Sequence, residues 1–333
     1  LGRTKVLRTQ DVHARRQERT AMQSISAAVH IQGPTVRYAE VTRDGSDVDL
    51  RRFGAETFEV DVARVLWGDT SPEPLDAITA TLSRIFDDTD ASKAGLVLHP
   101  VDAYSFLMPL PEGLSAEERD RRVAYQASLV TNTRSPGALH TVSRPVRTAV
   151  EDGETIEWVH VLAVPQQVEA RMETLFAEVP GMDTTGRILS AEAAAHLLGI
   201  SEEDGTPTTS ADDADEYQLA IGQYAGHTEY ALTRNGSWHH AHAAQNAPTA
   251  EDQAYYAVGM LNRIGVAPDA LEALVAYGSE VDAVADGPFE SVFGDVPTLL
   301  DPFGRLHRIW EPDAEQPGEY VPCIGGALAL SAE

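Results

Sequence analysis

A pattern of strand, glycine-bearing turn, strand, hairpin and strand occurs twice in this chain. The first copy begins with His30-Ile31 and reaches Thr-Arg-Asp-Gly-Ser at 42–46, and the second begins with Ala220-Ile221 and reaches Thr-Arg-Asn-Gly-Ser at 233–237. The copies lie about 190 residues apart, and a single-residue insertion aligns them. A complete β unit repeated at the start of each half predicts a duplicated domain with two lobes.

Strand and helix patterns alternate through the rest of each half, which predicts an α/β fold. Ser115 followed by Glu118 is a capping box that begins a helix, Thr249 and Gly265 bound a second helix, and Asn-Gly at 235–236 predicts a two-residue hairpin. The expected strands are 27–31, 36–41, 48–52, 94–99, 104–107, 157–164, 186–189, 217–222, 228–233, 237–243, 273–277 and 298–300. The expected helices are 73–87, 115–130, 166–179, 190–198, 249–265, 288–293 and one after Pro322.

Composition shifts divide the chain. Residues 1–22 are basic and are expected to form a disordered arm, or alternatively an arm that contacts an anionic partner or lipid. Residues 201–216 are acidic and are expected to form a linker or surface loop. The first lobe is expected over 23–200 and the second over 217–333.

The charge is strongly negative, with 25 Lys and Arg against 52 Asp and Glu and a formal net charge of −27. A surface of this sign repels phosphate backbones, which disfavours general nucleic-acid binding. The two lysines are Lys5 and Lys93, and an acid-rich, lysine-poor chain is typical of a protein kept soluble in a high-salt cytoplasm. A halophilic protein is therefore predicted, with compositional drift as the alternative.

Other features limit the location and the chemistry. No run of roughly 18 apolar residues and no signal-type segment occurs, so we expect a cytoplasmic protein without a transmembrane segment. The single cysteine, Cys323, excludes a disulfide framework and is expected to be a buried apolar residue.

His240 and His242 share one face of a predicted strand and are the candidates for metal ligands, but no third ligand is spaced with them. An ordinary polar strand is the preferred interpretation, so no metal site is predicted.

Four segments carry a resemblance to a known family. They are Thr35–Val41, Leu107–Glu118, Leu300–Phe303 and Tyr320–Ser331, in this order. Together they resemble the actin/Hsp70/sugar-kinase (ASKHA) superfamily and, more narrowly, the PilM family of type IV pilus assembly proteins, over about residues 25–331. The resemblance implies an actin-like, ribonuclease H-like fold of two lobes, with a subdomain inserted near 101–165 of the first lobe.

The resemblance also implies a nucleotide site, from which this sequence departs. In the family each lobe begins with a phosphate loop that contains an aspartate and a glycine, but here His30 and Ala220 stand in place of the acids, and Pro34 removes a backbone donor. The loops are therefore interpreted as degenerate. The positions that the resemblance assigns to nucleotide binding are Gly33, Thr35, Gly222, Gln223, Gly226, Gly278 and Ser279.

The function implied by the resemblance is that of a catalytically inactive, actin-like scaffold, with no catalytic residues and no cofactor. Such a scaffold would bind the cytoplasmic tail of an inner-membrane pilus or secretion protein at the inner face of the membrane, and could form homo-oligomers. The alternative is an active ATPase of the same assembly that holds ATP and Mg²⁺ through the remaining loop residues.

Overall fold

The structure is a computed structural model that describes residues 24–45, 47–68, 73–151, 153–179, 184–200, 215–281, 286–308 and 314–332. The predicted basic arm at 1–22 and nearly all of the predicted acidic linker at 201–216 lie outside these ranges. Within them, no helix is both long enough and apolar enough to cross a membrane.

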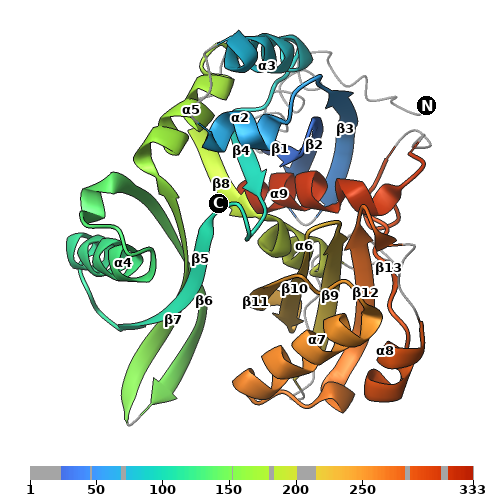
Figure 1. Cartoon of the computed structure of the whole chain (residues 1–333). Coiled ribbons are helices and arrows are strands. Elements are labelled where there is room, and N and C mark those ends of the chain that lie inside the picture. The colour runs from blue at the N-terminus through green and yellow to red at the C-terminus, as the bar shows by residue number, and fades with distance from the viewer. Residues whose placement is uncertain are drawn as a thin grey trace, which may run out of the picture.

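Two five-stranded sheets with the same strand order form the two lobes (Figure 1). The first has the order β3-β2-β1-β4-β8, and the second has the order β11-β10-β9-β12-β13. In each sheet the first three strands are antiparallel neighbours and the last two run parallel to the central strand. The duplication predicted from the repeat is therefore confirmed. The strands are β1 (Ser24–Gln32), β2 (Thr35–Asp44), β3 (Asp47–Thr57), β4 (Lys93–Leu98), β8 (Thr184–Leu189), β9 (Tyr217–Tyr224), β10 (His227–Arg234), β11 (Ser237–Gln245), β12 (Leu271–Gly278) and β13 (Thr298–Leu299).

The second hairpin of the second repeat agrees with its sequence in detail. Asn235 and Gly236 have φ values of 52° and 71°, which is the left-handed conformation that a two-residue hairpin turn of this kind requires. Each outer strand pair also contains one irregularity, which falls between Glu40 and Val41 in the first sheet and between Leu232 and Thr233 in the second. The two copies thus share a register shift as well as a strand order.

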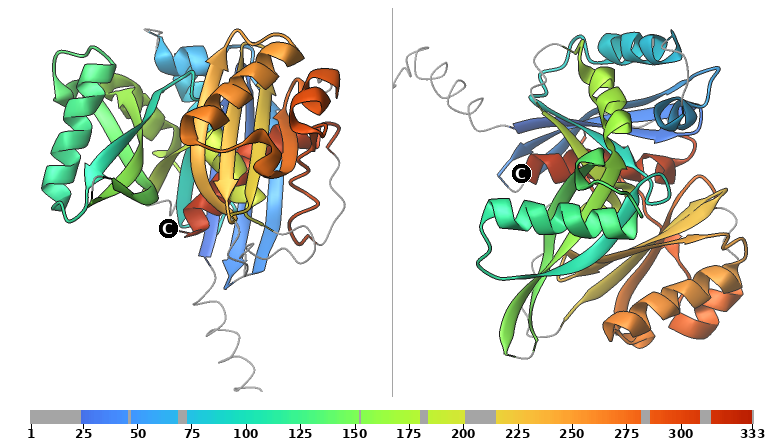
Figure 2. Two further views of the ribbon diagram at one scale, coloured as in Figure 1. Left: turned by 90° about the horizontal axis from the view of Figure 1, so that it is seen from below. Right: turned by 60° about the vertical axis from the view of Figure 1, so that its left-hand side comes forward.

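A three-stranded sheet in the order β5-β7-β6 forms the inserted subdomain, which projects to one side of the lobes (Figure 2). Its strands are β5 (Tyr104–Pro111), β6 (Leu139–Glu151) and β7 (Glu154–Pro165), and α4 (Ala116–Val130) covers one face. Ser115 accepts a hydrogen bond from the backbone N–H of Glu118 at 3.2 Å, so the predicted helix start is confirmed. The strand β6 was not expected from the sequence.

Two helices lie between the two large sheets, and each packs against the sheet formed by the other half of the chain. The first half of the chain ends in α6 (Ser190–Leu198), which packs against β9, β10 and β11, whereas α9 (Val321–Ala332) packs against β1, β2 and β4. The two helices cross each other where Gly325 meets the backbone of Ala193, and an added Cβ at position 325 would overlap that backbone. One apolar core, which includes Cys323, therefore runs through both lobes.

The remaining helices cover the outer faces. The outer face of the first sheet packs against α2 (Val62–Trp67), α3 (Glu73–Ile85) and α5 (Gln166–Phe176). The outer face of the second sheet packs against α7 (Ala250–Ile264) and α8 (Asp286–Phe293). Thr249 accepts a hydrogen bond from the Asp252 backbone N–H at 3.1 Å, and Gly265 ends α7 with a φ of 76°, as predicted. The short helix α2 was not predicted. Short 3-10 turns occur at Pro136–Ala138, Pro268–Ala270 and Pro317–Tyr320.

Candidate functional site

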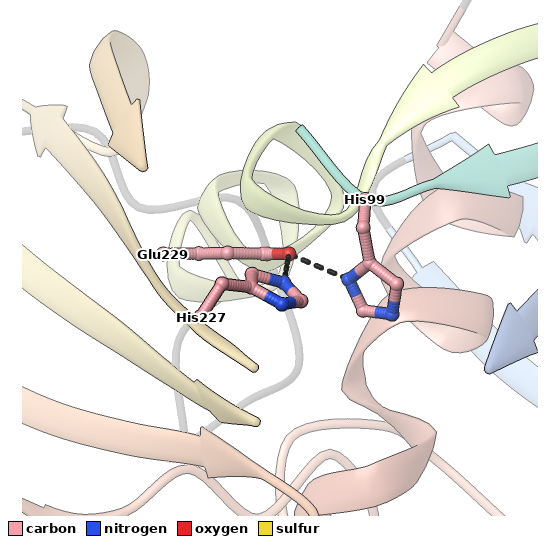
Figure 3. A group of neighbouring side chains, drawn as sticks. All are labelled: His99, His227 and Glu229. Atoms are coloured by element: carbon pink, nitrogen blue, oxygen red, sulfur yellow. Dashed lines mark hydrogen bonds and ion pairs between the residues drawn. The ribbon is translucent and has the colours of Figure 1, made fainter. Parts of the chain in front are cut away.

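Polar side chains that are buried meet where the ends of β1 and β4 face the second lobe. The carboxylate of Glu229 on β10 is at their centre, and the side chain is fully buried, with 0% of its surface exposed. Figure 3 shows Glu229 with the rings of His99 and His227 directed toward it. We call this set the interlobe cluster, and it consists of His30, His99, Ser190, His227, Glu229 and Tyr277.

Four hydrogen bonds converge on Glu229. Its Oε1 lies 2.6 Å from His99 Nδ1 and 2.8 Å from His227 Nε2. Its Oε2 accepts from Ser190 Oγ at 2.5 Å and from the hydroxyl of Tyr277 at 3.1 Å. Burial alone would raise the pKa of this carboxyl, but the charges and hydrogen bonds of the two histidines outweigh burial and hold the pKa well below its usual range. Glu229 is therefore an ionised carboxylate inside the protein.

His30 completes the cluster from the first lobe. Its Nε2 lies 3.0 Å from His99 Nε2, while its Nδ1 is buried without a hydrogen-bond partner. Burial, and next the neighbouring His99 and Arg37, lower the pKa of His30 well below its ordinary value, so this imidazole is neutral. His30 lies on β1, two residues before the end of that strand.

The predicted nucleotide-loop residues fall into groups. Gly222 and Gln223 lie on β9 next to Gly278 at the end of β12, and Gln223 pairs with Gly278 in the sheet. Ser279 follows and accepts a hydrogen bond from the Gln32 side-chain amide of the first lobe at 2.8 Å. The structure thus joins the two lobes directly at these loops.

The other loop residues lie apart from this contact. Gly33 has a φ of +57° in the turn between β1 and β2, and Thr35 pairs its hydroxyl with that of Thr57 at 3.5 Å. Gly226 is exposed in the turn between β9 and β10. These three residues do not touch the interlobe cluster through any hydrogen bond that the described residues show.

Two of the loop glycines are packed closely against protein. A Cβ added at Gly222 would come within 2.6 Å of the ring of Tyr277, and one added at Gly278 would overlap the backbone of Gln223. The space beside each of these two glycines is therefore filled by protein atoms. The ring of Tyr277 covers Gly222, and the backbone of Gln223 lies against Gly278.

The candidate metal ligands from the sequence, His240 and His242, lie on β11. Burial, and then Arg147, lower the pKa of His240 to about 4. Burial, and then Arg263, lower the pKa of His242. Among the described residues, the group of three metal-ligating side chains whose donor atoms come together is instead His99, His227 and Glu229.

Two grooves border the inserted subdomain. One, of about 550 Å³, lies between β5 and β11 and is lined in part by Leu107 and His240. The other, of about 480 Å³, lies between β6 and the pair α6 and α9. Trp238 lines the second groove, and its buried indole N–H has no hydrogen-bond partner among the residues that the structure describes.

Sequence reasoning did not identify His99, Ser190, His227, Glu229 or Tyr277. One signal was present, because His227 directly precedes the predicted strand 228–233 and lies two residues from Glu229, so the two share a face where the strand begins at His227. A charged residue within an otherwise apolar strand is a candidate for a buried functional group. The third of these side chains, His99, lies 130 residues away from Glu229 in the sequence, and only the tertiary fold brings it close.

Comparison with known proteins gives matches in structure only. No protein-family model matches the sequence, and no curated protein matches it. A solved PilM–PilN type IV pilus biogenesis complex matches with a TM-score of 0.62 at 14% identity, over 92% of this chain and 98% of that chain.

Two further structures match with lower scores. A protein with an actin-like ATPase fold and unknown function from Bacteroides thetaiotaomicron has a TM-score of 0.47 at 10% identity, over 86% of this chain and 94% of that one. The cytoplasmic domain of EpsL, an inner-membrane component of the Vibrio cholerae type II secretion system, has a TM-score of 0.45 at 12% identity, over 93% and 96%.

Proposed function

We propose that this chain, which has an actin-like fold resembling that of PilM, is an assembly protein of a type IV pilus or secretion system. In this proposal it works at the cytoplasmic face of the inner membrane, holds the cytoplasmic tail of a membrane partner, and does not turn over ATP. The observation that carries the proposal is the groove between β6 and the helix pair α6 and α9.

The groove suits an extended peptide. Its apolar surface includes Val146 on β6 and Leu328 on α9. Arg43 lies at the same groove and supplies positive charge on a chain whose net charge is −27. A short tail with apolar side chains and an acidic residue or free carboxylate would match this lining.

The lack of ATP turnover is supported by the residues at the interlobe cluster. A triphosphate brings about four negative charges, which Mg²⁺ must neutralise, and carboxylates usually position that ion. Here β1 and β9 carry His30 and the buried Ala220, and the ring of Tyr277 covers Gly222. The ionised Glu229 would add repulsion. These residues do not fit a Mg²⁺–triphosphate.

The tail-binding proposal is tested by peptide binding. Fluorescent peptides would tile the cytoplasmic tails of single-span membrane proteins encoded beside this gene, and anisotropy would report their affinity for the full chain. Val146→Glu should weaken binding of the bound peptide at least tenfold, because the carboxylate enters the groove. Val150→Glu is the matched control, since Val150 lies on the same strand with 73% of its surface exposed. Equal affinity for both variants would contradict the proposed groove.

A second experiment separates the scaffold from the alternative ATPase. Calorimetry with ATP and Mg²⁺ in molar KCl, together with a phosphate-release assay, should detect no metal-dependent turnover. Micromolar binding with phosphate release that Gly222→Val abolishes would establish an active ATPase instead.

A further inference from the structure

We propose that His99, His227 and Glu229 bind one divalent transition-metal ion of the Zn²⁺ class, and that this ion joins the two lobes. The proposal does not depend on the function proposed above, because it concerns the interlobe cluster and not the peptide groove.

The geometry of the donor atoms is the first argument. Each of the three residues offers one ligand atom, and these atoms all lie within 4.8 Å of one another. His99 comes from the end of β4 in the first lobe, whereas His227 and Glu229 project from the same face of β10 in the second (Figure 3). All three side chains are buried. A metal ion at their centre would therefore have ligands from both lobes.

The neighbours of the three residues are arranged as partners of metal ligands usually are. Metal-bound histidines commonly donate their second ring N–H to another group, and ligating carboxylates are themselves hydrogen-bonded. His99 would bind the ion through Nδ1, which leaves the proton on Nε2, and Nε2 lies 3.0 Å from the Nε2 of His30. The second oxygen of Glu229 already accepts from Ser190 and Tyr277.

The charge of the cluster is the third argument. The carboxyl group of Glu229 has 0% of its surface exposed, and a buried carboxylate is costly unless a cation or hydrogen-bond donors compensate its charge. In the described part of the chain, the ion-pair partners of Glu229 are His99 and His227, and neither Lys nor Arg pairs with it. A divalent ion bound to all three side chains would supply positive charge there, with the two histidines bound in the neutral form in which imidazole ligates metals.

The donor set selects the kind of ion. Two imidazole nitrogens with one carboxylate oxygen suit Zn²⁺, Co²⁺, Ni²⁺ or Fe²⁺, whereas Mg²⁺ and Ca²⁺ prefer oxygen ligands throughout. Three protein ligands leave at least one coordination position for water or another small ligand. The proposed ion thus differs from the Mg²⁺ that accompanies a nucleotide.

The test uses the full chain after treatment with EDTA. Titration with Co²⁺ should give visible absorption bands that saturate at one equivalent, and Zn²⁺ should displace the Co²⁺ and raise the melting temperature. His227→Gln should weaken Co²⁺ binding at least tenfold. The matched control is the double variant His240→Gln and His242→Gln, which changes a histidine pair on the neighbouring strand β11 and should bind as the unchanged chain does.

Two results would overturn the proposal. The first is wild-type protein that binds neither Co²⁺ nor Zn²⁺ stoichiometrically, in which case the cluster is held by hydrogen bonds alone. The second is loss of binding in the His240 and His242 variant with retention in His227→Gln. If His227→Gln does not fold, Tyr277→Phe keeps all three ligands but loses a hydrogen bond to Glu229, and should weaken Co²⁺ binding by a smaller factor.

Discussion

The two large sheets share a strand order but carry different side chains where they face each other. The first lobe contributes the imidazoles of His30 and His99 from β1 and β4, whereas the second contributes Glu229 and His227 from β10 and Tyr277 from β12. The first lobe also contains the inserted subdomain between β4 and β8. Neither lobe holds the interlobe cluster by itself.

This difference separates what the duplication fixes from what it leaves free. Strand order, the hairpin and the register shift recur in both copies because they depend on the backbone. The chemistry depends on individual side chains, and these are divided between the copies. Glu229 and His227 lie in the second copy, whereas His30 and His99 lie in the first. Changes that affect the copies unequally therefore test this interpretation.

The largest expected effect is at the crossing of α6 and α9. Gly325→Ala places a Cβ against the backbone of Ala193, where no flexible side chain can move aside, so the free energy of unfolding should fall by about 3 kcal/mol. Gly259→Ala is the matched control, because Gly259 is also within a helix, on α7, but has no atom within 4 Å of an added Cβ. Denaturant unfolding should show this control unchanged or stabilised by up to about 1 kcal/mol. Similar losses in both variants would show that the crossing is not tightly packed.

A smaller effect should distinguish β11 from its counterpart β3. Burial, and then Arg147, lower the pKa values of His239 and His240 on β11 to about 4, whereas β3 contains no histidine. Because the folded-state pKa values lie below 6.5, the unfolded state binds more protons as the pH falls, and the stability of β11 decreases from about pH 6.5 to 4. Hydrogen-exchange protection should therefore fall in β11 before it falls in β3.

The control for this prediction replaces both histidines with glutamine, which cannot be protonated in this range. The pH dependence of protection in β11 should then approach that of β3. A loss of protection that begins in β3, or that is unchanged in the glutamine variant, would contradict the assignment.

The smallest effect should be common to both lobes. With a net charge of −27, self-repulsion is screened as KCl rises from low to molar concentration, so the melting temperature should rise by a few degrees. His227→Gln should show the same rise, because the interlobe cluster is buried and little affected by salt. A melting temperature that does not change with KCl would remove the halophilic interpretation.

Local signals predicted much of the fold, because they act within a few residues. Ser115, Thr249 and the Asn235-Gly236 turn each determine the backbone beside them, and the repeat extends that information to whole sheets. Strand β6 was missed because it contains Pro145 and a register shift beside it, which interrupt the alternation of a regular strand. The interlobe cluster was missed because contacts across two lobes leave no periodic pattern in the sequence.

The exchange of α6 and α9 between the lobes has a consequence for how the protein is made. Ribosomal synthesis releases the first sheet early, but α9, the helix that covers its inner face, emerges only after all the strands of the second sheet. Until then, the apolar residues of β1, β2 and β4 that pack on α9 lack their native cover. A nascent first lobe is therefore an unfinished intermediate that chaperones would recognise by its exposed apolar face, and its folding is completed only after α9 has been synthesised.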